Sequence, residues 1–317
     1  MELWNNILPV IFFLGASVSG CAAPFQQIEL TPPKAAHLYI TAEIQVSDVC
    51  VKVKSEDGKK ETSKCFDTRG RKALGSGIHI KKYRNPRTGM DSSLVLTAQH
   101  LCNIIPEDKR DLLSLFYDTR GWDKNLWDIA DKNITLTSNP TIKWRYLVYD
   151  HNGIKYNVNP KTVALSNSIH DMCLLESERI SEEPIQFAAK SPIYGARIIN
   201  VSNPDAGRYL RGESPAFSLI TEGFLVNNDQ KLGILAVSDL NVTFGSSGSL
   251  LAVRRGNRWE LVGMVFAIKT TPYHPFPPLY TIATSIETIN QFVNSEFKLY
   301  LKREARIARE SIKVTTP

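Results

Sequence analysis

Between residues 37 and 285 the chain is a long series of short apolar runs, several alternating with polar residues and most bounded by turn residues. Apolar residues at 286, 289, 293, 297 and 300 then step by three and four, the spacing of an amphipathic helix. Hydrophobic residues make up 43% of the 317, enough for a globular core. Many short strands followed by one C-terminal helix predict an all-β protein built from barrels.

The N-terminus predicts export. The apolar run from Ile7 to Val18 is too short to span a bilayer and leads into small residues, as in a secretory signal peptide. Val18–Ser19–Gly20–Cys21 resembles the lipobox of bacterial lipoproteins, although no Lys or Arg precedes the apolar run. We therefore expect a signal peptide over 1–21, a lipid anchor on Cys21 and a tether over 22–36. The protein would then be anchored in the cell envelope, facing the periplasm or exterior. Simple secretion is the alternative.

Export to an oxidising compartment makes the remaining cysteines candidates for disulfides. A hairpin turn centred on Asp57–Gly58 brings Cys50 opposite Cys65, which predicts a bridge between them. Cys102 follows His100 by two residues and Cys173 follows Asp171 by two, so they bridge if these segments converge and are otherwise two buried thiols. None of the spacings matches a zinc site, and we expect no metal and no cofactor.

Three motifs stand in order along the chain, each beside an apolar strand-like run: Thr97–Ala98–Gln99–His100, Asp171–Met172–Cys173–Leu174–Leu175 and Gly245–Ser246–Ser247–Gly248–Ser249. They resemble the His, Asp and Ser motifs of the trypsin/chymotrypsin-like serine peptidases. Leu261–Val262–Gly263–Met264–Val265 resembles the strand that follows the serine in that family. The resemblance covers roughly residues 74–293.

The resemblance implies two six-stranded antiparallel barrels in a peptidase domain over 37–300. A helical insertion at about 104–133, a C-terminal helix over 285–310 and a tail over 311–317 complete the expected organisation. His100 would be the general base, Asp171 its orienting acid and Ser247 the nucleophile, with the backbone N–H groups of Gly245 and Ser247 as the oxyanion hole. The expected activity is that of a serine endopeptidase acting on proteins or peptides.

By the same resemblance, Asn241 lies at the base of the primary substrate pocket, and Phe266, Ala267 and Ile268 border the cleft. A neutral Asn241 disfavours a preference for Lys or Arg. Two positions depart from the family pattern. Ser246 replaces the Asp that pairs with a freed N-terminus in activated zymogens, which argues against that activation mechanism. Leu250 replaces the usual Pro, and the sequence does not explain this change.

Several alternatives stand beside this interpretation. Asp150 is a rival for the acid, although it lies in a turn. Gly-x-Ser-x-Gly marks the α/β-hydrolase nucleophile, but position 249 is Ser and no helix pattern follows. Gly75–Ser76–Gly77 is a candidate phosphate loop without the Lys that such a loop needs. A catalytically silent, peptidase-like envelope lipoprotein that binds a partner is the non-enzymatic alternative. The formal net charge of +6 is scattered, so we expect no nucleic-acid partner.

Overall fold

The computed structural model describes residues 33–54, 61–66, 71–102, 134–137, 141–159, 164–165, 169–203, 218–243, 245–269 and 280–315. All of them belong to one unit, Pro32–Pro317. The predicted signal peptide with Cys21, the helical insertion over 104–133 and the turn at Asp57–Gly58 lie outside the described residues. The predicted tether ends in a 3-10 turn, η1 (Lys34–Ala36), with Ala36 buried in the core. No helix in the described ranges is long and apolar enough to cross a membrane.

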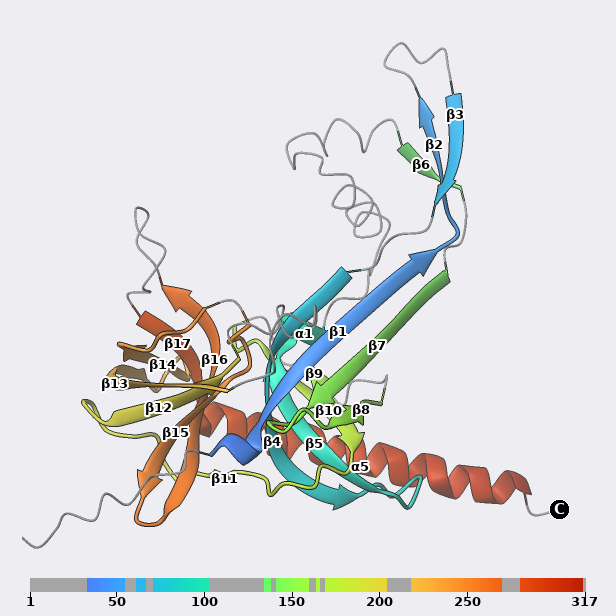
Figure 1. Cartoon of the computed structure of the whole chain (residues 1–317). Helices are drawn as coiled ribbons and strands as arrows, with labels where there is room; N and C mark the ends of the chain where they lie inside the picture. The colour runs from blue at the N-terminus through green and yellow to red at the C-terminus, as the bar shows by residue number, and fades with distance from the viewer. Residues whose placement is uncertain are drawn as a thin grey trace, which may run out of the picture. The chain divides into compact units, whose positions relative to one another are not determined.

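The first half of the chain forms a curled antiparallel sheet (Figure 1). Val158 forms an isolated bridge with Ser177, and the Asn159 N–H donates to the Glu176 carbonyl over 2.8 Å, so the end of β8 returns against β10. The curled sheet is therefore a partly closed barrel. Its strands run in the order β8 (Lys155–Asn157), β7 (Thr141–Tyr149), β1 (His37–Ser47), β4 (Arg71–Arg84), β5 (Asp91–Ala98), β10 (Met172–Glu178) and β9 (Ala164–Leu165).

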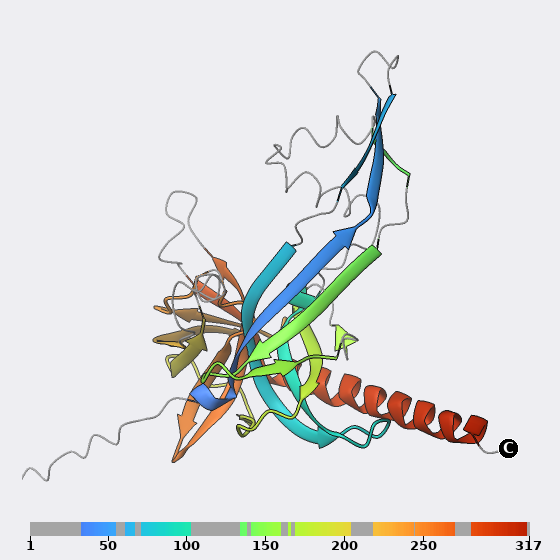
Figure 2. The same cartoon turned by 45° about the vertical axis from the view of Figure 1, so that its right-hand side comes forward.

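The second half forms a closed barrel (Figure 2), because its last strand, β17, pairs with both β14 and β16. Six strands take part in the ring, and β11 adds to β16 in parallel. The predicted all-β fold of two barrels is confirmed, although the first barrel is only partly closed, and the largely antiparallel described strands exclude an α/β-hydrolase fold. The strands run in the order β11 (Gln186–Phe187), β16 (Arg258–Lys269), β15 (Leu250–Arg255), β12 (Arg197–Ser202), β13 (Leu219–Asp229), β14 (Ile234–Ser238) and β17 (Tyr280–Ser285).

A small separate sheet holds the predicted hairpin. Strand β2 (Val49–Lys54) pairs with β3 (Glu61–Phe66) in the register that places Cys50 opposite Cys65, and the two sulfurs are bonded. β6 (Ile134–Leu136) adds to the other edge of β2. The register confirms the prediction from the Asp57–Gly58 turn, because each step outward from a two-residue turn pairs one residue from each strand.

The C-terminal helix, α5 (Ile286–Thr315), begins directly after β17 and continues beyond the predicted end at residue 310. The five positions predicted to form its apolar face are all buried: Ile286, Ile289, Val293, Phe297 and Tyr300. The basic run over 302–309 follows them, and its Lys302, Arg303, Arg306 and Arg309 are exposed. This part of the helix therefore carries its basic side chains at the surface.

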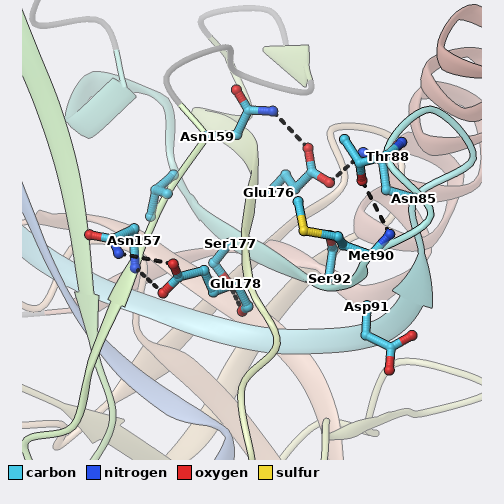
Figure 3. A pocket seen from close by; sticks show the side chains of 11 residues that line it. Asn85, Thr88, Met90, Asp91, Ser92, Asn157, Asn159, Glu176, Ser177 and Glu178 are labelled. Atoms are coloured by element: carbon cyan, nitrogen blue, oxygen red, sulfur yellow. Dashed lines mark hydrogen bonds between the residues drawn. The ribbon is translucent and has the colours of Figure 1, made fainter. Parts of the chain in front are cut away.

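The middle of α5 is tied to the first barrel beside a pocket of about 320 Å³, whose lining residues are drawn in Figure 3. The buried Glu176 carboxylate accepts hydrogen bonds from Asn85 (2.6 Å), Asn159 (2.9 Å) and the Tyr300 hydroxyl (2.5 Å). Burial raises the pKa of Glu176, but these hydrogen bonds outweigh it and lower the pKa overall. The carboxylate therefore stays ionised and anchors the helix. Because this pocket lies at the opposite ends of β5 and β10 from His100 and Asp171, it is not part of the candidate site.

Two histidines are fully buried in the first barrel. Burial, with a smaller contribution from His151, lowers the pKa of His37 to about 3. The His37 ring lies edge-on to Tyr39, with 5.4 Å between the ring centroids. Burial and the nearby Lys82 ammonium lower the pKa of His79 to about 4. Both rings are therefore neutral at neutral pH.

These histidines predict a loss of stability in mild acid. An unfolded histidine takes up a proton near pH 6.5, whereas the folded ones do so near pH 4 or below, so protons favour the unfolded chain. The contribution is fully present above pH 6.5 and is lost as the pH falls. By pH 5 each histidine should lower the free energy of unfolding by about 2 kcal/mol. Urea unfolding between pH 7 and pH 5 measures this. Titration of either ring between about pH 6 and pH 7 in NMR spectra would contradict it.

Candidate active site

The first two predicted residues, His100 and Asp171, meet where β5 and β10 lie side by side. The register pairs Met172 with Ala98, so the segments that follow β5 and precede β10 are neighbours. The short helix α1 (Gln99–Cys102) begins there, and its Gln99 N–H donates to the Asp171 carbonyl over 2.8 Å. Asp171 has a φ of 47°, which turns the chain before β10 starts.

The Asp171 carboxylate holds His100 by two hydrogen bonds. One oxygen accepts from the His100 backbone N–H over 2.9 Å, and the other bonds the ring Nδ1 at 2.6 Å. An ionised carboxylate only accepts hydrogen bonds, so Nδ1 carries the proton and the neutral ring leaves Nε2 as a base. The Asp171 side chain is 16% exposed and that of His100 is 50% exposed. This pair therefore presents a basic nitrogen to solvent in a fixed orientation.

A buried disulfide fixes the two segments to each other. Cys102, in α1, is bonded to Cys173, in β10, with 6.5 Å between their Cα atoms. The Tyr146 hydroxyl also donates to the Cys102 carbonyl. Of the two possibilities that the sequence left open, the structure therefore contains the bridge. It joins the residues two positions after His100 and two positions after Asp171, so it stabilises their approach.

The third predicted residue, Ser247, lies in a tight turn that precedes β15. Neighbouring N–H groups in this turn are bonded: Ser246 to the Thr243 carbonyl (3.0 Å), Gly248 to the Val265 carbonyl (2.8 Å) and Ser249 to the Ser246 carbonyl (2.9 Å). By contrast, the N–H groups of Gly245 and Ser247 donate to no partner in the described part of the chain. These are the two donors that the sequence predicts for an oxyanion hole. Phe244 lies outside the described residues.

The serine turn packs directly on the first barrel. A Cβ atom at Gly248 would lie 2.1 Å from the Ser76 carbonyl oxygen and 2.6 Å from the Thr97 hydroxyl, and the φ of this residue is +84°. Glycine is therefore required there. Thr97 stands three positions before His100, in the strand that ends at the His100–Asp171 pair. The turn and the pair thus share one wall, built by β4 and β5.

The Ser247 hydroxyl and the His100 ring are not hydrogen-bonded to each other in the structure, although both residues are described. Ser247 is half-buried and His100 is exposed. The structure thus brings His100 and Asp171 into contact and places Ser247 on the adjoining turn, without the final hydrogen bond. Asp150 lies elsewhere. It is fully buried and accepts hydrogen bonds from the Asn152 and Ile154 N–H groups, each over 2.9 Å, within its own turn.

Of the four residues predicted to line the substrate pocket, one precedes the serine turn in the chain and three lie on β16, the strand that bonds the turn through Val265. Asn241 is exposed in the segment between β14 and the turn. Phe266, Ala267 and Ile268 are half-buried on β16, directly after Val265, whose carbonyl accepts from Gly248. A bulge between Val265 and Ala267 shifts the pairing with β17 at Phe266. Among the described residues, no group of three or more His, Cys, Asp or Glu is arranged to hold a metal ion.

Sequence reasoning missed Ser76, which contacts the serine turn through both its backbone and its hydroxyl. Ser76 stands between two glycines on β4, in the stretch whose sequence pattern matches only an incomplete phosphate loop. No local signal marks the residue, because the partners of its hydroxyl lie more than a hundred positions later in the chain.

No family model and no curated protein matches this chain. Among solved structures, the serine endoprotease from Yersinia pestis is similar, at 15% sequence identity and a TM-score of 0.44. The match covers 80% of this chain and 62% of that protein, so this chain spans about three fifths of its length.

Proposed function

We propose that this protein is a serine endopeptidase that hydrolyses peptide bonds with Ser247, His100 and Asp171. The observation that carries the proposal is the His100 ring, held by the Asp171 carboxylate with Nε2 left as a base. It lies beside a serine turn with two N–H groups that have no partner in the described chain. A poorly acidic hydroxyl becomes a nucleophile only with such a base and orienting acid.

In the proposed reaction, His100 Nε2 takes the proton of the Ser247 hydroxyl as the oxygen attacks the substrate carbonyl. The N–H groups of Gly245 and Ser247 bind the oxyanion of the tetrahedral intermediate. His100 then gives the proton to the leaving amine, and an acyl group remains on Ser247. Water, deprotonated by the same ring, releases the acid. Asp171 keeps the proton on Nδ1 and stabilises the charged ring.

The reaction requires the Ser247 hydroxyl to turn toward Nε2. Rotation about one side-chain bond moves a serine hydroxyl between its staggered positions. Hydrogen bonds between catalytic groups are often long or poorly aligned before the substrate binds. The missing hydrogen bond also supports a second candidate function, a catalytically silent peptidase-like protein that binds a partner in the envelope.

Labelling with a fluorophosphonate separates the two functions, because this probe reacts with an activated serine. We expect the full chain to be labelled, and Ser247→Ala and His100→Ala to be unlabelled while folded. Ser249→Ala is a matched control on the same turn, and it should keep the label. A folded wild-type chain that resists the probe would favour the binding function.

We also propose that the protein is exported and attached to a membrane by a lipid on Cys21. The two disulfides support an oxidising compartment. Cys21→Ser should move the protein from the membrane fraction to the soluble fraction of the cell envelope or medium. Unchanged fractionation would exclude the lipid anchor.

A further inference from the structure

Ser76 joins the two barrels at the serine turn. It is fully buried on β4, a strand of the first barrel. Its carbonyl accepts from the Thr97 hydroxyl over 2.7 Å, within the same barrel. Its other hydrogen bonds reach the second half of the chain: Asn203 at the end of β12, and Gly245 and Ser247 in the turn.

The Ser76 hydroxyl is used in both directions. It accepts from the Asn203 N–H over 3.2 Å and donates to the Gly245 carbonyl over 2.9 Å. The Asn203 N–H bonds a lone pair of the hydroxyl oxygen. The single hydrogen of the hydroxyl therefore remains available for the Gly245 carbonyl. The Ser76 backbone N–H donates separately to the Ser247 carbonyl over 2.8 Å. One residue therefore holds the carbonyls of both residues that carry the predicted oxyanion donors.

With these bonds, two peptide planes of the serine turn are hydrogen-bonded both at the carbonyl oxygen and at the N–H group. The plane between Gly245 and Ser246 is held by Ser76 at its oxygen and by the Thr243 carbonyl at its N–H. The plane between Ser247 and Gly248 is held by Ser76 at its oxygen and by the Val265 carbonyl at its N–H. Because a peptide unit is rigid, fixing both ends sets its orientation. The two unbonded N–H groups belong to the planes that directly precede these.

We propose that Ser76 is a positioning residue that orients the oxyanion-hole donors Gly245 and Ser247 from the opposite barrel. This inference rests on the proposed peptidase activity. Donors of this kind act because they are already oriented when charge develops. The Ser76 side chain is fully buried and its hydroxyl bonds Asn203 and Gly245, so we expect its effect to fall on the transition state and not on substrate binding.

Ser76→Ala removes the hydroxyl and keeps the backbone N–H. It leaves the Gly245 carbonyl and the Asn203 N–H without this partner, so the turn should lose its fixed orientation. Ser202→Ala is the matched control. Ser202 is fully buried on β12 beside Asn203, and its hydroxyl has no hydrogen-bond partner among the residues that the structure describes. Both variants lose one buried serine hydroxyl, but only Ser76 bonds the turn.

The first measurement is the second-order rate of fluorophosphonate labelling, followed by kcat and KM on a peptide substrate identified for the wild type. We expect Ser76→Ala to lower the labelling rate and kcat by about 10- to 100-fold, as for a small misplacement of reacting groups, with KM within about twofold. Ser202→Ala should stay within about twofold of the wild type. Equal labelling of the two folded variants, or a raised KM with unchanged kcat, would overturn the proposal.

The second measurement is amide hydrogen exchange, which does not depend on activity. We expect Ser76→Ala to speed exchange of the Ser246 amide at least tenfold, because its peptide plane loses the bond from the hydroxyl, with the β12–β13 amides unchanged. Unchanged exchange at Ser246 would reject the role of the Ser76 hydroxyl even if the protein is an enzyme. Faster exchange in Ser76→Ala, together with a wild-type chain that the probe does not label, would reject the peptidase function and keep the structural part of the inference.

Discussion

Asp171→Asn is expected to lower the rate of fluorophosphonate labelling by roughly 10⁴-fold while the protein stays folded. Asparagine can keep the hydrogen bond from the His100 backbone N–H, because one side-chain oxygen remains. The new amide group then faces Nδ1 and donates to it, whereas the native carboxylate accepts from it. The ring proton moves to Nε2, which can no longer take the proton of Ser247.

Asp150→Asn is the matched control for this experiment. Asp150 is more deeply buried than Asp171, but its carboxylate bonds the N–H groups of its own turn and the Tyr156 hydroxyl. This variant should lose stability and keep its labelling rate. If Asp150→Asn loses the label while Asp171→Asn keeps it, the orienting acid has been assigned to the wrong residue.

Removal of the Cys102–Cys173 bridge is expected to reduce both stability and labelling. The bridge joins positions 71 residues apart, so by the chain-entropy estimate Cys102→Ala with Cys173→Ala should lower the free energy of unfolding by about 4 kcal/mol. His100 lies in a four-residue helix that this bridge ties to β10. We therefore expect labelling to slow by about tenfold or more, because the His100–Asp171 geometry loosens. Urea unfolding and labelling rates measure the two effects.

The Cys50–Cys65 bridge provides the control for the double variant that lacks the Cys102–Cys173 bridge. It closes a hairpin in the separate small sheet, with a separation of 15 residues. Cys50→Ala with Cys65→Ala should destabilise the hairpin and leave labelling within about twofold of the wild type. A similar loss of labelling in both double variants would show that the Cys102–Cys173 bridge has no specific role at the site.

Local patterns in the sequence were sufficient to predict several parts of the fold. The Asp57–Gly58 turn predicted the register of Cys50 and Cys65, because hairpin pairing is decided by the turn. Helical spacing predicted the buried face of α5, from Ile286 to Tyr300, because each turn of a helix repeats the same face. The order of the His, Asp and Ser motifs, through their family resemblance, predicted the double barrel and the residues that we propose as catalytic.

Other features depend on contacts between distant segments. The closure of the second barrel by β17, the burial of Glu176 beneath Tyr300 and the choice between a bridge and free thiols at Cys102 all arise in this way. Ser76 has no distinguishing local pattern, yet it bonds the residues that carry the predicted oxyanion donors. The sequence by itself determined the strands, the C-terminal helix and the candidate residues, because these depend on near neighbours along the chain. The tertiary structure alone decided how the serine turn is held, because its partners come from both barrels.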